Sequence, residues 1–150
     1  FRLITLCDVI EHLEDDRKAV QAVRAALDQE GIALVTVPAL QGLWSKHDEV
    51  NQHYRRYSKR MLCALFAEKD WNLIKVSYFS SLLLPAIWLS RKLSSLRSGK
   101  SETGDLRFGP KLADAFLCFI FTLEKYFLRL GAFPLGSSLI LVARKKACPS

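Results

Sequence analysis

The chain has 150 residues, half of them hydrophobic, and carries 22 basic against 15 acidic side chains, a net charge of +7. This length and apolar content suffice for one domain with a substantial core, and they exclude a disordered or low-complexity chain. The bases concentrate in residues 51–111, where twelve bases accompany four acids. Such a bias suits an anionic small molecule, a membrane surface or nucleic acid, and equally an ordinary solvated basic face.

The cysteines and the first residue give further expectations. Cys7, Cys63, Cys118 and Cys148 lie far apart, with no CxxC and no Cys/His pair at metal-binding spacing. We therefore expect a reducing, cytoplasmic environment and no metal site. The sequence opens with Phe1 and its only methionine is Met61, so we interpret it as part of a longer protein.

The first elements in chain order predict a strand, a helix and a second strand. FRLITLC (1–7) is a short apolar run with β-branched content, typical of a strand covered on both faces. Acids at 14–16 favour a helix start, apolar residues then repeat at helical spacing, and Gly31 ends the helix. IALVTV (32–37) is a second buried strand. This βαβ unit requires a parallel sheet.

The remaining elements complete a single expected domain. A polar, aromatic-rich connection over 38–57 precedes a helix capped by Ser58, and the alternating 72–79 strand belongs near a sheet edge. A Ser/Gly-rich charged loop over 94–110, an apolar helix over 111–130 and a last strand over 137–144 follow. We expect one partial domain over 1–150 with an apolar and basic helical insertion at 80–130.

Several short motifs occur in a characteristic order. Asp8-Val9-Ile10-Glu11-His12 follows the first strand, and Glu30-Gly31-Ile32-Ala33-Leu34 opens the second. In this order they resemble the middle of class I S-adenosylmethionine (SAM)-dependent methyltransferases, particularly the type 11–12 group that includes ubiquinone-biosynthesis methyltransferases. There a D/E-x-x-E-H segment ends strand four and a Gly-Gly-x-Leu segment begins strand five. Glu30 departs from this pattern by replacing the first glycine. His53-Tyr54-Arg55-Arg56-Tyr57-Ser58 resembles a stretch after strand five in one subgroup.

The resemblance implies a Rossmann-like, doubly wound α/β sheet, of which this chain supplies strands four to seven with the last pair antiparallel. The family's glycine-rich turn after strand one would bind S-adenosylmethionine. None of the chain's glycines forms a G-x-G after a strand. The chain is therefore expected to lack most of the cofactor site and to be inactive alone, while the full-length protein uses SAM as its cofactor.

The resemblance also suggests functional residues. The end of strand four would line the cofactor crevice through Leu6, Cys7, Asp8, Val9, Glu11 and His12. His12 and His47 are candidate general bases, because an unperturbed imidazole titrates near neutrality. The connection after Pro38 supplies the candidate substrate contacts Trp44, His47, His53, Tyr54, Arg55, Arg56 and Tyr57. The structural alternatives are a His12 that bonds local backbone and a loop pinned by pairs between Asp48/Glu49 and Arg55/Arg56.

Three functional interpretations remain open. The first is SAM-dependent methylation of a small molecule, for which an anionic or lipid-linked acceptor suits the basic charge. The second is a non-catalytic remnant or interaction module, with self-association through strand 1–7 as an exposed sheet edge. The third is peripheral membrane contact through 79–130, where apolar runs fall short of the roughly 20 residues of a spanning helix. Nucleic-acid binding is a weaker interpretation, because no recognised motif accompanies the bases.

Overall fold

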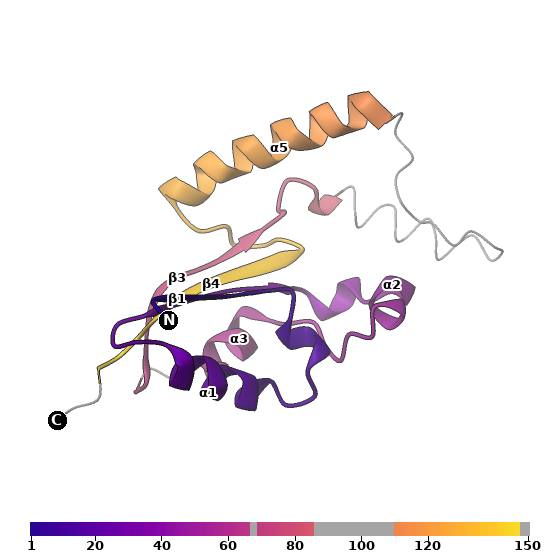
Figure 1. Cartoon of the computed structure of the whole chain (residues 1–150). Coiled ribbons are helices and arrows are strands. Elements are labelled where there is room, and N and C mark those ends of the chain that lie inside the picture. The colour runs from indigo at the N-terminus through magenta and orange to yellow at the C-terminus, as the bar shows by residue number, and fades with distance from the viewer. Residues whose placement is uncertain (67–68, 86–109, 148–150) are drawn as a thin grey trace.

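The structure, a computed structural model, describes residues 1–66, 69–85 and 110–147. Its strands are β1 (Leu3–Cys7), β2 (Ile32–Pro38), β3 (Trp71–Phe79) and β4 (Ser138–Lys145). They form one sheet in the order β1-β2-β4-β3 (Figure 1), in which β1 and β2 are parallel and β4 is antiparallel to both of its neighbours. The predicted α/β fold, with a parallel βαβ unit and an antiparallel final pair, is confirmed, and β3 lies at the sheet edge as expected.

The connection from β1 to β2 contains the 3-10 helix η1 (Ile10–His12) and the helix α1 (Asp16–Ala26). Asp15 caps α1, since its carboxylate accepts a hydrogen bond from the Lys18 backbone N–H at 3.0 Å. The helix ends earlier than the apolar repeat suggested, because Leu27 already has an extended backbone. Glu30, which replaces the expected glycine, has a left-handed φ of 60°, a conformation that glycine adopts at lower cost.

The connection from β2 to β3 holds η2 (Gln41–Leu43), α2 (Lys46–Val50) and α3 (Lys59–Leu65). Ser58 caps α3 as predicted, because its hydroxyl accepts from the Met61 backbone N–H at 3.2 Å. The helix α5 (Pro110–Leu130) precedes β4. The loop expected over 94–110 lies outside the described residues up to 109, and Pro110 already begins α5. Within the described residues, no helix is long and apolar enough to cross a membrane.

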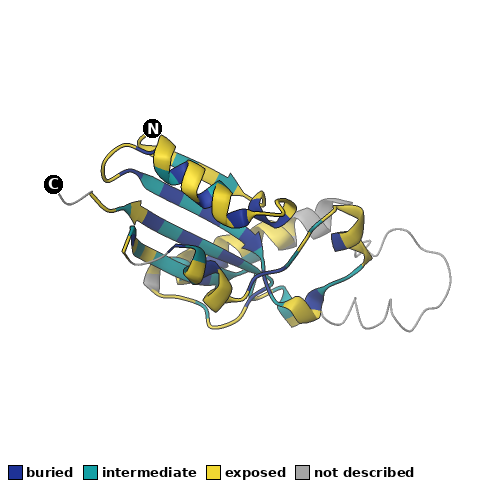
Figure 2. Ribbon diagram, turned by 90° about the horizontal axis from the view of Figure 1, so that it is seen from below, coloured by how far each residue is buried: buried dark blue, intermediate teal, exposed yellow. Residues whose placement is uncertain are grey.

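The main hydrophobic core lies on the face of the sheet that α1 and α3 cover (Figures 1 and 2). Alternate residues of β2 and β4 point into it and are fully buried: Ala33, Val35, Val37, Leu139, Leu141 and Ala143. Tyr57, Leu62 and Phe66 pack against the same cluster. Burial of these side chains supplies the dominant favourable term in folding.

The opposite face of the sheet is covered unevenly. In Figure 1, α5 lies over this face, and the Lys75 side chain of β3 reaches the α5 backbone at Leu128. Along β1 the residues alternate between exposed and half-buried, and Leu3 is 55% exposed. The expectation that strand 1–7 is covered on both faces is therefore wrong for the described residues, because only the α1 side of β1 is covered. Self-association through this strand stays a prediction.

Candidate functional site

The strands β1, β2 and β3 run in the same direction, so the segments that leave Cys7, Pro38 and Phe79 emerge at one edge of the sheet. In open α/β sheets, ligands bind outside the carboxyl ends of the strands. Three residues just beyond this edge, Asp8, Leu40 and Ser80, have left-handed φ values of 52°, 60° and 54°. Strained backbone of this kind concentrates at functional sites, so this edge of the sheet is the candidate site.

The segment after α2 crosses the ends of β1 and β2. The Tyr54 backbone N–H donates to the carbonyl of Glu11 at 2.8 Å, and the Tyr57 N–H donates to the carbonyl of Pro38 at 2.8 Å. The crossing brings His53 beside His12, with ring centroids 4.6 Å apart in an edge-to-face arrangement. Two motifs that lie some forty residues apart in the sequence thus form one cluster.

Glu11 lies in the centre of this cluster and is completely buried. Neither of its carboxylate oxygens has a hydrogen-bond partner among the described residues. Burial, reinforced by the nearby Asp8 carboxylate, raises the pKa of Glu11 to about 7. A buried carboxyl group without a partner is rare in folded proteins, and a pKa near neutrality suits it to proton transfer.

Asp48 is the second fully buried carboxylate at this edge, and its oxygens are fully bonded. Arg56 donates to it from Nε at 2.8 Å and from Nη2 at 3.1 Å, and the Ser45 backbone N–H donates at 2.9 Å. His53 Nδ1 lies 3.0 Å from Asp48 Oδ1. Burial alone would raise the pKa of Asp48, but the hydrogen bonds from Arg56 and His53 outweigh it and hold the pKa below its usual value.

Asp16 gathers the other basic and aromatic residues of the same segment. It accepts hydrogen bonds from Arg55 Nη1 at 2.9 Å and from the Tyr57 hydroxyl at 2.8 Å. Burial and the Asp16 carboxylate raise the pKa of the Tyr57 hydroxyl above its ordinary value. The sequence identified Asp16 only as an acid at a helix start. Arg55 and Tyr57 lie 39 and 41 positions later, and no local pattern predicts hydrogen bonds over that separation.

The pinned-loop alternative is confirmed for Arg56, which pairs with Asp48. Arg55 is also paired, but with Asp16 instead of Asp48 or Glu49. Both guanidinium groups therefore already have carboxylate partners within the chain. Their contact with a substrate stays a prediction, as it does for the buried Tyr57. Tyr54, by contrast, is 57% exposed next to the Glu11 cluster.

The remaining candidate residues are distributed around this edge. Leu6 is half-buried, Cys7, Val9 and His12 are exposed, and Asp8 is exposed with its N–H bonded to the Thr36 carbonyl at 3.0 Å. Trp44 is half-buried at the end of η2. His47 is exposed on α2, where its Nε2 lies 2.9 Å from Asn51 Nδ2. The structure thus brings His12 and His53 to Glu11, whereas His47 contacts Asn51, the residue that caps the end of its own helix.

The same cluster has the donor set of a metal site. Glu11, His12 and His53 each offer one ligand atom, and these atoms all lie within 4.8 Å of one another. His53 Nδ1 lies 3.0 Å from Asp48 Oδ1, and a carboxylate on one ring nitrogen commonly orients a histidine whose second nitrogen binds a metal. The expectation of no metal site rested on the lack of CxxC and of Cys/His pairs at metal-binding spacing, whereas these three residues come from positions 11, 12 and 53. Imidazole and carboxylate ligands together suit a divalent cation.

Comparisons with known proteins place the fold. No protein-family model matches the chain, and no curated protein matches it. Among solved structures, phosphoethanolamine N-methyltransferase 2 of Haemonchus contortus in complex with S-adenosyl-L-methionine superposes with a TM-score of 0.53 at 17% identity, over 98% of this chain and 34% of that one. The cyclase SpnF superposes with a TM-score of 0.51 at 19% identity, over 99% of this chain and 52% of that one.

These similarities show that the chain has the fold of part of SAM-dependent methyltransferases. The chain spans between about a third and a half of the length of these two proteins. One of them is named a methyltransferase and the other a cyclase. Because one fold hosts different reactions, the function has to be argued from the residues at the carboxyl edge.

Proposed function

We propose that this chain forms the acceptor side of a SAM-dependent methyltransferase that acts on a small molecule. The observation that carries the proposal is the buried, unpartnered Glu11 beside His12 and His53 at the carboxyl edge of the sheet. The superposition with a SAM-bound methyltransferase supports it at the level of the fold. The cofactor would contact this chain through the end of β1, at Leu6, Cys7, Asp8 and Val9.

The chemistry required of these residues is positioning and proton removal. In methyl transfer, a lone pair of the acceptor oxygen or nitrogen attacks the methyl carbon, and the carbon–sulfur bond breaks with its electrons going to sulfur. The acceptor must also lose its proton. The exposed His12 can accept it, while Glu11, with a pKa of about 7, stabilises the imidazolium that results. Asp48 orients His53 beside this pair. Tyr54 offers an exposed ring against which an acceptor can pack.

A cation-assisted reaction is the second candidate, and the donor set of Glu11, His12 and His53 favours it. A divalent cation would neutralise the Glu11 carboxylate and lower the pKa of an acceptor hydroxyl bound to it. Equilibrium dialysis of this chain against Mn²⁺ separates the two. Mn²⁺ binding that is abolished by Glu11→Gln and retained by His47→Ala would favour the cation-assisted reaction. Equal Mn²⁺ concentrations in both compartments would favour proton transfer by His12 without a cation.

The decisive test of methyl transfer uses the whole reading frame in which this chain lies. We expect calorimetry to show that the full-length protein binds S-adenosylhomocysteine in the micromolar range, and that the 150-residue chain does not. His12→Ala should lower methyl transfer by about a hundredfold or more, the usual contribution of a general base, and by more than any accompanying loss of S-adenosylhomocysteine affinity. A full-length protein that binds no S-adenosylhomocysteine would contradict the proposal and favour a non-catalytic remnant.

The two histidines proposed as bases can be distinguished in the same assay. His12 belongs to the Glu11 cluster, whereas His47 lies on the surface of α2 and contacts Asn51. We therefore expect His47→Ala to retain most of the activity that His12→Ala loses. The opposite result would move the catalytic base from η1 to α2.

A further inference from the structure

The helix α5 lies over β3 and β4 without filling the space beneath it. A groove of about 320 Å³ remains between the helix and the sheet, and its apolar walls are Phe79, Phe121, Leu128 and Ile140. None of these side chains is buried as the main core is, and Phe121 is 47% exposed. Protein interiors leave few voids larger than a water molecule. A space of this size, at the lower end of the roughly 300–1,000 Å³ typical of small-molecule sites, is therefore a candidate ligand site.

Polar contacts at the two ends of the groove fix α5 above the strands. At one end, Lys75 of β3 donates to the Leu128 carbonyl. At the other end, the Ser81 backbone N–H donates to the Glu124 carboxylate at 2.7 Å. Because these contacts hold the helix in place, the groove exists before a ligand arrives, and binding would not have to open it.

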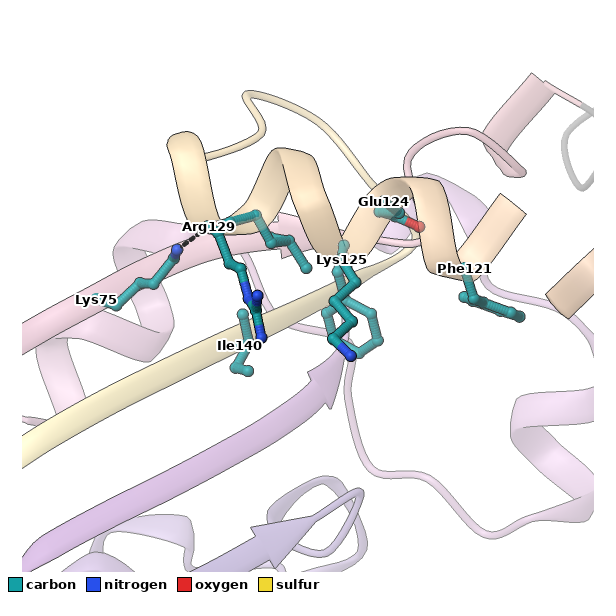
Figure 3. Close-up of a pocket in the computed structure, with 8 residues that line it drawn as sticks. Lys75, Phe121, Glu124, Lys125, Arg129 and Ile140 are labelled. Atoms are coloured by element: carbon teal, nitrogen blue, oxygen red, sulfur yellow. Dashed lines mark hydrogen bonds between the residues drawn. The ribbon is translucent and has the colours of Figure 1, made fainter. Parts of the chain in front are cut away.

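Three cations border the groove. Figure 3 shows Lys125 and Arg129 extending from α5 toward the strands beside Ile140, and Lys75 lines the same groove from β3. Lys125 and Arg129 are four residues apart, a spacing at which like charges on a helix repel each other. Neither of them forms an ion pair with another residue of the described chain. An anion bound between them would relieve this repulsion.

The acid that lines the groove leaves this charge in excess. Glu124 is 2% exposed and bonds to the Ser81 backbone, and no ion pair among the described residues connects it to Lys125 or Arg129. Three cations thus face one acid. The acid lies near the end of β3, whereas Lys75 and Arg129 border the opposite end. Apolar walls with positive charge concentrated at one end complement a small anion that has an apolar body.

We propose that this groove binds a small amphipathic anion, in which a carboxylate or phosphate group is attached to a short apolar body. The anionic group accepts hydrogen bonds from Lys125 and Arg129, which are strong because both partners are charged. The apolar body lies between α5 and Ile140 and extends toward Phe79. The Glu124 carboxylate repels the anionic group from that end and thereby fixes the orientation of the ligand.

This ligand site is separate from the candidate methyl-transfer site. The groove lies along β3, the Glu11 cluster follows β1, and both β2 and β4 lie between these two strands in the sheet. None of the residues that line the groove belongs to the Glu11 cluster. The inference therefore does not depend on methyl transfer, and it can hold or fail independently of the proposed function.

The test is a titration of the ¹⁵N-labelled 150-residue chain with octanoate and with octyl phosphate, followed by ¹H–¹⁵N spectra. Both probes carry an oxyanion on an eight-carbon body, and we expect them to shift amide signals of residues 75–79, 121–129 and 140. The tighter of the two identifies the preferred anionic group. Octylammonium and 1-octanol have the same body without the anion, and their dissociation constants should be higher by about tenfold or more.

Two sets of variants separate the charge from the apolar walls. Lys125→Gln/Arg129→Gln should raise the dissociation constant of octanoate by about tenfold or more, and high salt should act in the same direction. Phe121→Ser should raise it by about fivefold, since a ligand covers only part of this side chain. The substituted side chains are exposed, so circular dichroism should show that each variant folds.

The matched control is Lys59→Gln/Arg60→Gln, which removes the same charge from exposed positions on α3 and should leave the dissociation constant of octanoate unchanged. An equal loss of affinity in the control would show that only the net charge matters, and it would overturn the proposal. Octylammonium that binds as tightly as octanoate, or amide shifts confined to residues outside the groove, would overturn it as well.

Discussion

The two buried carboxylates at the carboxyl edge of the sheet have opposite surroundings. Asp48, in α2, accepts hydrogen bonds from Arg56 and from the Ser45 backbone, and it contacts His53. Glu11, in η1, is equally buried but has no hydrogen-bond partner among the described residues. The pKa of Asp48 lies below its usual value, and that of Glu11 rises to about 7.

This difference separates structure from chemistry within one small region. A buried charge whose partners are all supplied by the chain holds elements together, because removing any partner leaves another charge unpaired. A buried carboxyl group without partners destabilises the fold when it ionises, and such a group is retained where a ligand or a proton completes it. Asp48 therefore belongs to the architecture of the loop, and a functional role for Glu11 is part of the proposal made above.

The largest expected effect comes from Asp48→Asn. The substitution leaves the buried Arg56 guanidinium without its carboxylate, so the free energy of unfolding should fall by about 3–5 kcal/mol. Urea unfolding followed by circular dichroism measures this change. The control is Glu49→Gln, an exposed neighbour on the same helix, for which we expect less than about 0.5 kcal/mol. Equal effects of the two substitutions would contradict the structural role of Asp48.

At alkaline pH, Glu11→Gln should raise the free energy of unfolding, whereas Asp48→Asn lowers it. The folded pKa of about 7 exceeds the ordinary value of 4.5, so the folded state binds the proton more tightly and stability falls as the pH rises from about 4.5 to about 7. In metal-free buffer at pH 8, the variant should be more stable than the wild type by about 2–3 kcal/mol.

Urea unfolding at a series of pH values would test the Glu11 prediction, with the exposed Glu14→Gln as the control. The stability difference between Glu11→Gln and the wild type should shrink as the pH falls from about 7 to below 4.5, because the wild-type carboxyl group is then protonated in both the folded and the unfolded state. A difference that is independent of pH would show that Glu11 is ionised or partnered in solution.

Tyr57→Phe removes a buried hydroxyl that, like the groups around Asp48, has a carboxylate partner within the chain. The hydroxyl donates to the Asp16 carboxylate at 2.8 Å, and a hydrogen bond to a charged group contributes about 1.5–3 kcal/mol. We expect the midpoint of thermal unfolding to fall accordingly. Tyr54→Phe provides the matched control, because Tyr54 is 57% exposed and should change stability by less than about 0.5 kcal/mol.

The smallest effect is expected for His47→Ala. Its ring contacts Asn51 on the surface of α2, so the stability change should remain below about 0.5 kcal/mol. His53→Ala, by comparison, removes a hydrogen bond to buried Asp48 and should cost about 1.5 kcal/mol or more. If His47→Ala proved the more destabilising of the two in urea unfolding, His47 would have to belong to the buried network.

Local patterns determined most of the fold. The apolar runs 1–7 and 32–37 with a helix between them predict a parallel pair, because both strands need cover and the crossover must be helical. The alternation of 72–79 indicated an edge strand, and Ser58 indicated a helix start, because a hydroxyl can satisfy a free N–H. These features depend on residues that are neighbours in sequence. The E-H motif and the His53–Tyr57 segment were indicated instead by their resemblance to segments of class I SAM-dependent methyltransferases.

The tertiary structure alone decided how those two motifs meet. His12 and His53 come together because the segment after α2 crosses the ends of β1 and β2, and no local pattern encodes that path. The same crossing buries Glu11 without a partner and pairs Arg55 with Asp16. The one-sided cover of β1 likewise depends on which elements pack against each face of the sheet. Such long-range contacts depend on the packing of the whole domain, which hydrophobic periodicity along the chain does not specify.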